Sequence, residues 1–432
     1  PSNAGIYEIT KIVSIGSDSN SYTYTAYVVD ANAVVDFVAE PQVGVTYSGF
    51  SIKGTLNNVS GTLYAIAGEE GEVPTLSDFR LYGQSYKITS DFVDAQFEAD
   101  NDGEYYIYYA VVNPNGALTS EVYSTKISVT EISTAEQFIE LATSGGDSSS
   151  IYKLTADIDF SGVQWKVGDE FKALLDGQGH TISGITVNDS SDESKGSVFF
   201  GLDGGSLMNI TFKNVSLTGA KENGLFGTAT GGYIGNVKLE NFAVEGTERI
   251  GGLVGKVKEQ SGMDLIIERV SLVNDDDHII TAGTGKYVGG LIGHMQVGGS
   301  VNSTYKVNVS ISNCYVDSTV ICGNSEAGGI VGKWDDGYNG VVAKSLTIDR
   351  CVFVGTVSCR SRAGGIIAYQ TGSYPITITN CVSFGDIHHA NSTDPIQVAE
   401  KNASGVFGGY NANAPTTVLN CYAKFAEHNA NY

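Results

Sequence analysis

A five-residue phrase that recurs at a nearly constant spacing most limits what this chain can fold into. The copies read Gly-Gly-Leu/Ile-Val/Ile-Gly/Ala and begin at Gly251, Gly289, Gly328 and Gly364, with a weaker copy at Ser404. The steps between their first residues are 38, 39, 36 and 40 residues. A period of this size is typical of stacked structural repeats. The second half of the chain is therefore predicted to be a solenoid.

Each repeat also carries short β-rich runs, such as Leu265–Val270 and Ile376–Val382, separated by Gly or Asn. Gly and Asn tolerate left-handed backbone corners, and strands of successive coils would stack about 4.8 Å apart. We therefore expect like residues to form ladders along the stack. One predicted corner ladder contains Asn209, Asn236, Asn313, Asn380 and Asn420, interrupted by Arg269 and Arg350.

A short amphipathic helix is predicted at residues 133–143, just before the coils. Ser133 and Glu136 have the spacing of a capping box, and Phe138, Leu141 and Ala142 follow at helical spacing. A stack of strands leaves its first coil with an open edge, and a helix can cover it. We expect this helix to cap the solenoid, which would occupy residues 132–432.

The N-terminal third predicts antiparallel β structure. Residues 1–30 alternate apolar and polar side chains on both sides of a Gly-Ser-Asp-Ser-Asn turn and predict a hairpin, which would either close a preceding sandwich domain or add strands to the next one. Residues 31–131 offer seven short strands at the spacing of a β-sandwich, the first of them at residues 34–39. Segments 46–54 and 103–111 resemble the second and sixth strands of fibronectin type III or immunoglobulin-like modules.

The block Asp176-Gly-Gln-Gly-His-Thr-Ile182, followed by the glycine phrases, resembles the GLUG-motif proteins of bacterial cell surfaces. The resemblance covers roughly residues 131–432. It implies a right-handed parallel β-helix on an exported, adhesin-like protein. The predicted fold class is thus all-β, with an N-terminal β-sandwich, a short capping helix and a right-handed parallel β-helix.

Charge and composition restrict the classes of partner. With 25 Lys and Arg against 48 Asp and Glu, the net charge is −23, which disfavours nucleic acid and anionic membranes. No apolar run is long enough to span a membrane and no leader is present, so we expect an extracellular or cell-surface monomer whose leader has been removed, attached to a membrane only through an anchor outside this chain. Six cysteines follow the repeat and are expected to be buried thiols.

Candidate binding residues follow the glycine phrases, where about 10 extra residues per repeat would project as loops from one edge. Aromatic residues recur there at nearly equivalent places, and they could form a platform for an extracellular glycan or protein ligand. The alternative is that they shield the outer face of the coils. The candidates are Trp334, Tyr338, Tyr369, Tyr374 and Tyr410.

The sequence contains no motif that selects a catalytic residue, a metal site or a cofactor. Asp275-Asp276-Asp277-His278 is acidic, but consecutive residues of one turn cannot all face one ion, so we expect a solvated turn. A zinc-protease His-Glu-x-x-His motif and a Gly-x-Ser-x-Gly elbow are absent. We therefore expect a surface adhesin or binding module without catalysis. The alternatives are a polysaccharide lyase or glycosidase built on a β-helix, and a structural stalk.

Overall fold

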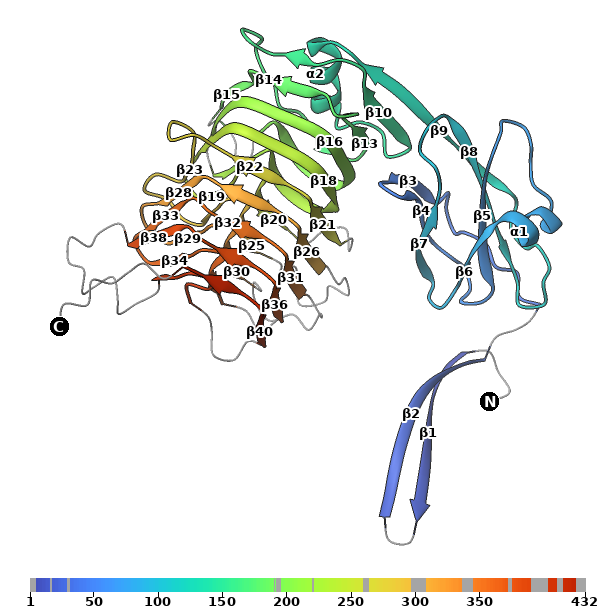
Figure 1. Cartoon of the computed structure of the whole chain (residues 1–432). Helices are drawn as coiled ribbons and strands as arrows, with labels where there is room; N and C mark the ends of the chain where they lie inside the picture. Colours follow the sequence, from blue (N-terminus) through green and yellow to red (C-terminus); the bar gives the residue numbers. More distant parts are fainter. Residues whose placement is uncertain are drawn as a thin grey trace. The chain divides into compact units, whose positions relative to one another are not determined.

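The chain is nearly all β and forms two compact units, residues 1–129 and 130–432 (Figure 1). The computed structural model describes residues 5–15, 18–28, 32–189, 191, 196–219, 221–258, 264–296, 308–335, 345–371, 375–389, 403–409 and 415–424. It contains two helices in these residues, and neither is long and apolar enough to cross a membrane.

The first unit begins with the predicted hairpin. Strands β1 (Gly5–Ile15) and β2 (Asp18–Val28) pair antiparallel in a sheet of two strands. A sandwich of two antiparallel sheets follows. One sheet has the order β3 (Gln42–Thr46), β4 (Gly49–Thr55), β7 (Phe92–Glu98). The other has the order β6 (Gln84–Lys87), β5 (Thr62–Gly68), β8 (Tyr105–Val112), β9 (Tyr123–Ile132).

Two details of the sandwich differ from the sequence prediction. Residues 34–39, expected as a strand, make one isolated bridge, Phe37 to Leu56, and the first strand is β3 instead. The other is a helix, α1 (Leu76–Tyr82), in a segment without a predicted element. Thr75 and Asp78 form its capping box, and Phe79 anchors it in a small buried cluster.

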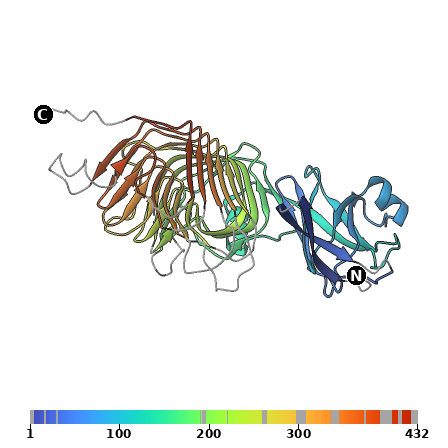
Figure 2. The same cartoon turned by 90° about the horizontal axis from the view of Figure 1, so that it is seen from below.

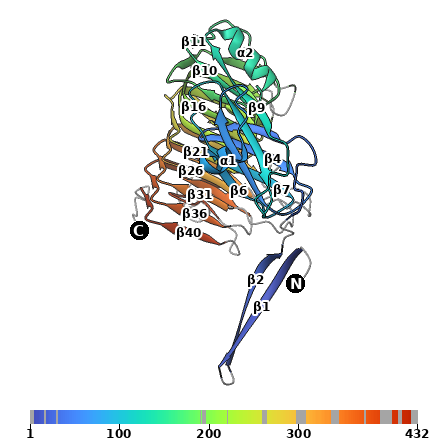
Figure 3. The same ribbon diagram turned by 90° about the vertical axis from the view of Figure 1, so that its right-hand side faces the viewer.

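The second unit is a right-handed parallel β-helix, as predicted. Figures 2 and 3 show the strands of successive coils lying side by side down the stack. Strands β16 (Phe199–Gly219) and β18 (Phe226–Glu245) each run almost around a coil and pair along their length, with register shifts between Leu202 and Ser206. In the other coils the same path is divided into short strands, which form five columns.

The five columns are as follows in chain order. The first contains β12 (Glu170–Phe171), β20 (Val254–Val257), β25 (Ile292–Gln296), β30 (Val331–Asp335) and β35 (Ile367–Gln370). The second contains β10 (Ser150–Leu154), β13 (Leu174–Asp176), β21 (Leu265–Glu268), β26 (Asn308–Ser312), β31 (Ser345–Asp349), β36 (Ile376–Thr379) and β40 (Thr416–Leu419). The third contains β11 (Ile158–Asp159), β14 (Thr181–Ser183), β22 (Ser271–Val273), β27 (Tyr315–Asp317), β32 (Val352–Phe353), β37 (Val382–Ser383) and β41 (Tyr422–Ala423). The fourth contains β15 (Thr186–Asp189), β23 (Ile279–Thr281), β28 (Thr319–Cys322), β33 (Thr356–Cys359) and β38 (Asp386–His389). The fifth contains β17 (Glu222–Asn223), β19 (Arg249–Gly251), β24 (Val288–Gly289), β29 (Glu326–Gly328), β34 (Arg362–Gly364) and β39 (Ala403–Ser404).

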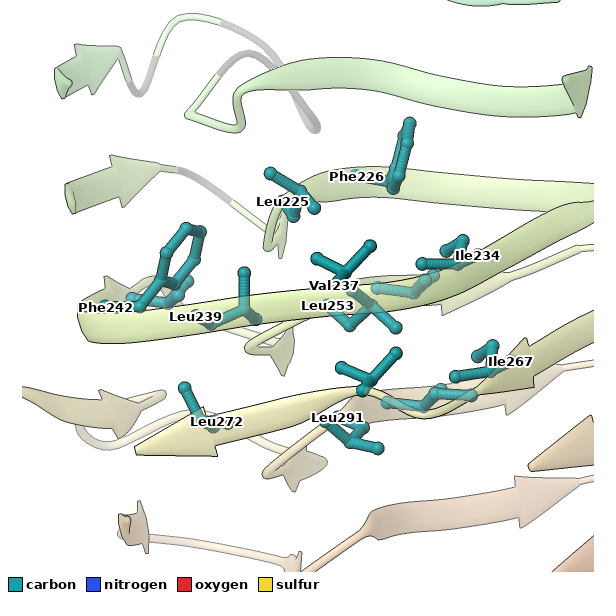
Figure 4. Close-up of a cluster of buried hydrophobic side chains, with 14 of the residues drawn as sticks. Leu225, Phe226, Ile234, Val237, Leu239, Phe242, Leu253, Ile267, Leu272 and Leu291 are labelled. Carbon is teal, nitrogen blue, oxygen red and sulfur yellow. The ribbon is translucent and has the colours of Figure 1, made fainter. Parts of the chain in front are cut away.

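Apolar ladders fill the interior of the coils. Figure 4 shows Ile234 aligned with Ile267 and Leu239 with Leu272 on consecutive coils. All four side chains have no solvent exposure. Burying such a side chain stabilises the fold by about 1.5–3 kcal/mol, so each coil contributes to the core only when its neighbours are stacked on it.

The predicted asparagine ladder is confirmed. All seven of its members have left-handed backbone, with φ between 51° and 55°. Asn236 Nδ2 donates to Asn209 Oδ1 at 2.8 Å, and Arg350 Nε donates to Asn313 Oδ1 at 2.8 Å. Arg350 thus replaces the amide donor in the ladder, whereas Arg269 donates to the Tyr233 hydroxyl oxygen at 3.3 Å and to Glu268.

The capping helix is α2 (Ala135–Ser144), and its cap lies one residue later than predicted. Thr134 is the N-cap and Gln137 completes the capping box, instead of Ser133 and Glu136. Phe138 packs against Phe160, Trp165 and Phe199 at ring-centroid distances of 5.7–6.0 Å. The helix therefore covers the apolar end of the first coils.

Candidate binding site at the glycine corner

The glycine phrase forms a tight corner between the fifth and first strand columns. A Cβ atom at Gly251 would lie 2.3 Å from the Val254 carbonyl oxygen, and one at Gly255 would lie 2.9 Å from the Arg249 carbonyl oxygen. The backbones on the two sides of the corner thus approach too closely for any side chain. The glycines recur because every coil makes this close approach.

Charged and aromatic side chains flank the corner in two rows. They lie two residues before each phrase and directly after its fifth residue, in register from coil to coil. We call these two rows, together with Asp335, the corner cluster. One row is Glu222, Arg249, Tyr287, Glu326 and Arg362, and the other is Thr228, Lys256, His294, Lys333 and Tyr369.

Ion pairs join the first coils of the corner cluster. Glu222 Oε1 lies 3.3 Å from Arg249 Nη1 and 3.4 Å from Lys256 Nζ. The Glu222 side chain is 5% exposed, whereas those of Arg249 and Lys256 are 16% and 19% exposed. A buried carboxylate is stabilised in its charged form by paired cations, so Glu222 joins consecutive coils electrostatically.

His294 lies at the centre of the corner cluster. Arg249 Nε donates to its Nδ1 at 3.2 Å, and the Tyr287 ring lies 4.5 Å away between centroids. Burial, followed by the charges of Lys333 and Arg249, holds the pKa of His294 well below its usual value. The imidazole is therefore neutral near pH 7. Because Nδ1 accepts a hydrogen bond, the proton resides on Nε2.

The Nε2 atom of His294 has no hydrogen-bond partner among the described residues, although the side chain is only 3% exposed. Asp335 Oδ2 is 3.9 Å from it, beyond hydrogen-bond range. Lys333 Nζ lies 3.0 Å from the same carboxylate oxygen and 4.7 Å from the centre of the Tyr287 ring. The corner thus holds the His294 Nε2–H donor beside the charged Asp335 carboxylate, which can accept a hydrogen bond.

The coils of Glu326 and Arg362 form the more exposed end of the corner cluster. Arg362 Nη1 pairs with Glu326 Oε1 at 2.8 Å, and the Arg362 guanidinium lies over the half-buried Tyr369 ring at 3.7 Å from its centroid. Ser325 Oγ donates to Glu326. The Arg362 side chain is 29% exposed and that of Asp335 is 26% exposed. An aromatic ring, a guanidinium and a carboxylate therefore all reach solvent in this region.

The aromatic platform predicted from the sequence needs correction. Trp334 is completely buried, because β30 aligns it with Met295 and Gln370 in the interior ladder. It cannot stack on a ligand in this fold. Tyr369 lies in the corner cluster, and Tyr338, Tyr374 and Tyr410 lie outside the described residues.

The sequence analysis missed the charged members of the corner cluster. Their signal was available in the printed sequence, because Arg249, Glu326 and Arg362 each lie two residues before a glycine phrase. Lys256 and Lys333 likewise follow its fifth residue. Taken singly these are ordinary surface charges, and only the register of the coils brings them together.

The acidic run that begins at Asp275 is a local structure. Asp275 and His278 contact each other within one turn, with 2.5 Å between Oδ1 and Nδ1. Throughout the described part of the chain, no group of three or more His, Cys, Asp or Glu residues could hold a metal ion.

Comparison with known proteins identifies a partial relative. The chain is 35% identical over 127 residues to Halomucin of Haloquadratum walsbyi, a match that covers 26% of this chain. It spans about 1% of the length of that protein. No family model matches the chain, so its relationships to the GLUG-motif proteins and to fibronectin type III modules stay predictions.

Two solved structures match the chain at low similarity. The structure of a candidate immunoglobulin A1 protease from Bacteroides ovatus is 21% identical, with a TM-score of 0.49, and the match covers 68% of this chain and 84% of that one. Pectate lyase Pel3 from Pectobacterium carotovorum is 12% identical, with a TM-score of 0.16, over 82% of this chain and 92% of the lyase. The fold of this chain rests on its own strand pairing.

Proposed function

We propose that this chain is a non-catalytic binding module of an exported or cell-surface protein and that its β-helix binds an extracellular glycan through the glycine corner. The observation that carries the proposal is the stacked pair of Arg362 and Tyr369, fixed by Glu326. Sugar rings pack on aromatic faces, and their hydroxyl groups hydrogen-bond to planar charged side chains beside them. A rigid scaffold holds these groups in place before a ligand arrives, which lowers the cost of binding.

Two properties of the chain support an extracellular location. The partial similarity to Halomucin is consistent with export, and the net charge of −23 suits a solvated surface protein. The proposal includes the GLUG-like character of residues 131–432 and a monomeric state. It places membrane attachment, where there is any, in an anchor outside this chain.

The ion pairs of the corner cluster favour binding over hydrolysis. A glycosidase needs one carboxyl group that stays protonated to donate to the leaving group. Glu222 and Glu326 each lie beside an arginine, and Asp335 lies beside Lys333. Each of these carboxylates is engaged in an ion pair with a cation of the protein, whereas a general acid must present its carboxyl group to the leaving group.

The test is a glycan-array screen of three proteins: the wild type, Tyr369→Ala and the matched control Tyr315→Ala. Tyr315 is also half-buried but lies on β27, in another strand column. We expect wild type and Tyr315→Ala to bind the same glycans and Tyr369→Ala to lose at least tenfold in affinity. All three proteins should melt at similar temperatures.

Three results would contradict this proposal. If Tyr369→Ala bound glycan as well as the wild type, the glycan site would lie elsewhere on the protein. Failure of the wild type to bind any glycan would favour a protein ligand or a stalk. Release of reducing ends or unsaturated products from acidic and neutral polysaccharides would establish the enzymatic alternative.

A further inference from the structure

Two cysteines on consecutive coils lie directly opposite each other in the fourth strand column. Cys322 ends β28 and Cys359 ends β33, and the two are in-register partners in the parallel ladder. Neighbouring strands lie about 4.7–4.9 Å apart, and disulfide-bonded Cα atoms are usually about 4.4–6.8 Å apart. Cys322 Sγ donates to the Gly285 carbonyl oxygen at 3.4 Å, and the two thiols influence each other's pKa. Their backbone positions therefore suit a disulfide.

The surroundings of Cys322 also favour a reactive thiolate. The Cys359 thiol and then the backbone N–H groups of Asn324 and Ser325 lower the pKa of Cys322 to about 7, against the opposite effect of burial. The Ser325 N–H donates to Cys322 Sγ at 3.3 Å. The thiolate is the form that attacks a disulfide.

The other four cysteines, Cys314, Cys351, Cys381 and Cys421, form a separate column. Cys351 and Cys381 donate to backbone carbonyls of their own coil and its neighbour, for example Cys351 Sγ to Asp349 O at 3.4 Å and Cys381 Sγ to Ile348 O at 3.7 Å. The neighbouring thiols and burial raise the pKa of both groups. They are protonated, core-filling thiols and provide an internal control.

We propose that Cys322 and Cys359 form a disulfide that ties two consecutive coils together when the protein folds in an oxidising compartment. The Cys322 thiolate attacks a small-molecule disulfide such as oxidised glutathione, which forms a mixed disulfide and releases one glutathione thiolate. Cys359 then loses its proton and attacks the Cys322 sulfur, which expels the second glutathione. Two protein thiols are oxidised, one glutathione disulfide is reduced, and the two protons pass to the released thiolates.

The bond would stiffen the exposed end of the corner cluster. Glu326 follows Cys322 by four residues and Arg362 follows Cys359 by three. Cys359 Sγ also donates to the Ser325 carbonyl at 2.6 Å. A covalent link between these coils thus fixes the two turns that carry the Glu326–Arg362 ion pair. The inference does not depend on whether that corner binds a glycan.

Both sulfur atoms are buried, so the bond should form as the coils close during refolding. The experiment is to refold the full chain in a glutathione redox buffer, block free thiols under denaturing conditions and map the peptides by mass spectrometry. We expect one disulfide, between Cys322 and Cys359, with the remaining four of the six cysteines free. The oxidised protein should melt about 5 °C or more above its reduced form.

Alanine variants keep the test independent of folding defects. Ala282 occupies the position that precedes Cys322 in the stack and is buried, so Cys322→Ala and Cys359→Ala should be accommodated. Each should abolish the disulfide and the redox-dependent melting shift. The control Cys351→Ala/Cys381→Ala should keep both. Six free thiols in the oxidised, refolded wild type, or a disulfide within the Cys314, Cys351, Cys381 and Cys421 column, would overturn the proposal.

Discussion

Arg362 places its guanidinium 3.7 Å above the centroid of the Tyr369 ring while it pairs with Glu326 on the preceding coil. One side chain thus serves two purposes, because it neutralises a carboxylate that is only 5% exposed and presents a stacked surface to solvent. The candidate binding corner and the stability of the stack therefore depend on the same side chain.

This coupling predicts the cost of Arg362→Ala. The change leaves Glu326 buried without this cation and should lower the free energy of unfolding by about 2 kcal/mol, less than for a fully buried pair because Arg362 is partly solvated. Urea denaturation measures it. The matched change Arg360→Ala, at an exposed arginine two residues away, should cost less than about 0.5 kcal/mol. In the double variant with Glu326→Gln most of the loss should disappear, and a purely additive double variant would show that the pair is not coupled.

The glycine phrase predicts a severe effect at Gly329. A Cβ atom there would lie 2.1 Å from the Gly365 carbonyl oxygen of the next coil and 2.4 Å from Phe353 Cγ. Gly329→Ala should therefore cost at least about 3 kcal/mol, because backbone atoms must shift. Gly103→Ala is the control, since a Cβ atom at Gly103 would meet nothing within 4 Å. Similar unfolding curves for the two variants would contradict the close approach of consecutive coils.

The sequence was sufficient for the repeat architecture because its constraints are local. Asn380 and Asn420 mark a left-handed corner, and Gly329 marks a place without room for a side chain. Each such requirement is met within one coil and repeated in the next. The residue pattern that specifies one coil is therefore repeated along the sequence, and each copy supports the same prediction.

The composition of the candidate binding site could not be predicted from the repeat period alone. Trp334 and Tyr369 both follow a glycine phrase, but Trp334 is six residues after its first glycine and Tyr369 is five. Side chains alternate between faces of a strand, so a difference of one residue places them on opposite faces. Tyr369 aligns with Lys333 outside the coil, whereas Trp334 lies in the core.

Two variants of Asn236 should separate the stability cost of a strained backbone from the cost of a lost hydrogen bond in the asparagine ladder. Asn236 has φ 53° and donates to Asn209 at 2.8 Å. Asn236→Ala should cost about 1–2 kcal/mol, because alanine is strained in left-handed backbone and the ladder bond is lost. Asn236→Gly should cost less, since glycine adopts this conformation readily. Thermal unfolding of both variants is the measurement. A glycine variant that is less stable than the alanine variant would mean that strain is not the larger cost.

The corrected position of Trp334 makes a spectroscopic and an energetic prediction. The chain has two tryptophans, Trp334 with no exposure and Trp165 with 9%, so native emission should be blue-shifted and poorly quenched by acrylamide. Trp334→Ala should cost about 3–5 kcal/mol because it leaves a large cavity. Trp334→Phe, which removes an indole N–H without a partner among the described atoms, should cost much less. Strong quenching of half the emission in the native protein would show that one of the two rings is exposed.

His294 should make the second unit less stable as the pH falls below about 6.5, the ordinary pKa of histidine. Burial and the charges of Lys333 and Arg249 lower the pKa of His294 in the folded state, against the weaker opposite effect of Asp335. In acid the unfolded chain binds a proton there that the folded chain excludes. The free energy of unfolding therefore falls by up to about 1.4 kcal/mol per pH unit, until the folded-state pKa is reached.

The measurement is urea unfolding of wild type and His294→Gln between pH 7.5 and 5. Carboxylates also make the wild-type curve depend on pH, so the informative quantity is the difference between the two proteins. Glutamine cannot take up a proton, and the variant should therefore lose stability less steeply below pH 6.5. Parallel curves for wild type and His294→Gln would mean that His294 is protonated equally in the folded and unfolded chains, contrary to its burial between two cations.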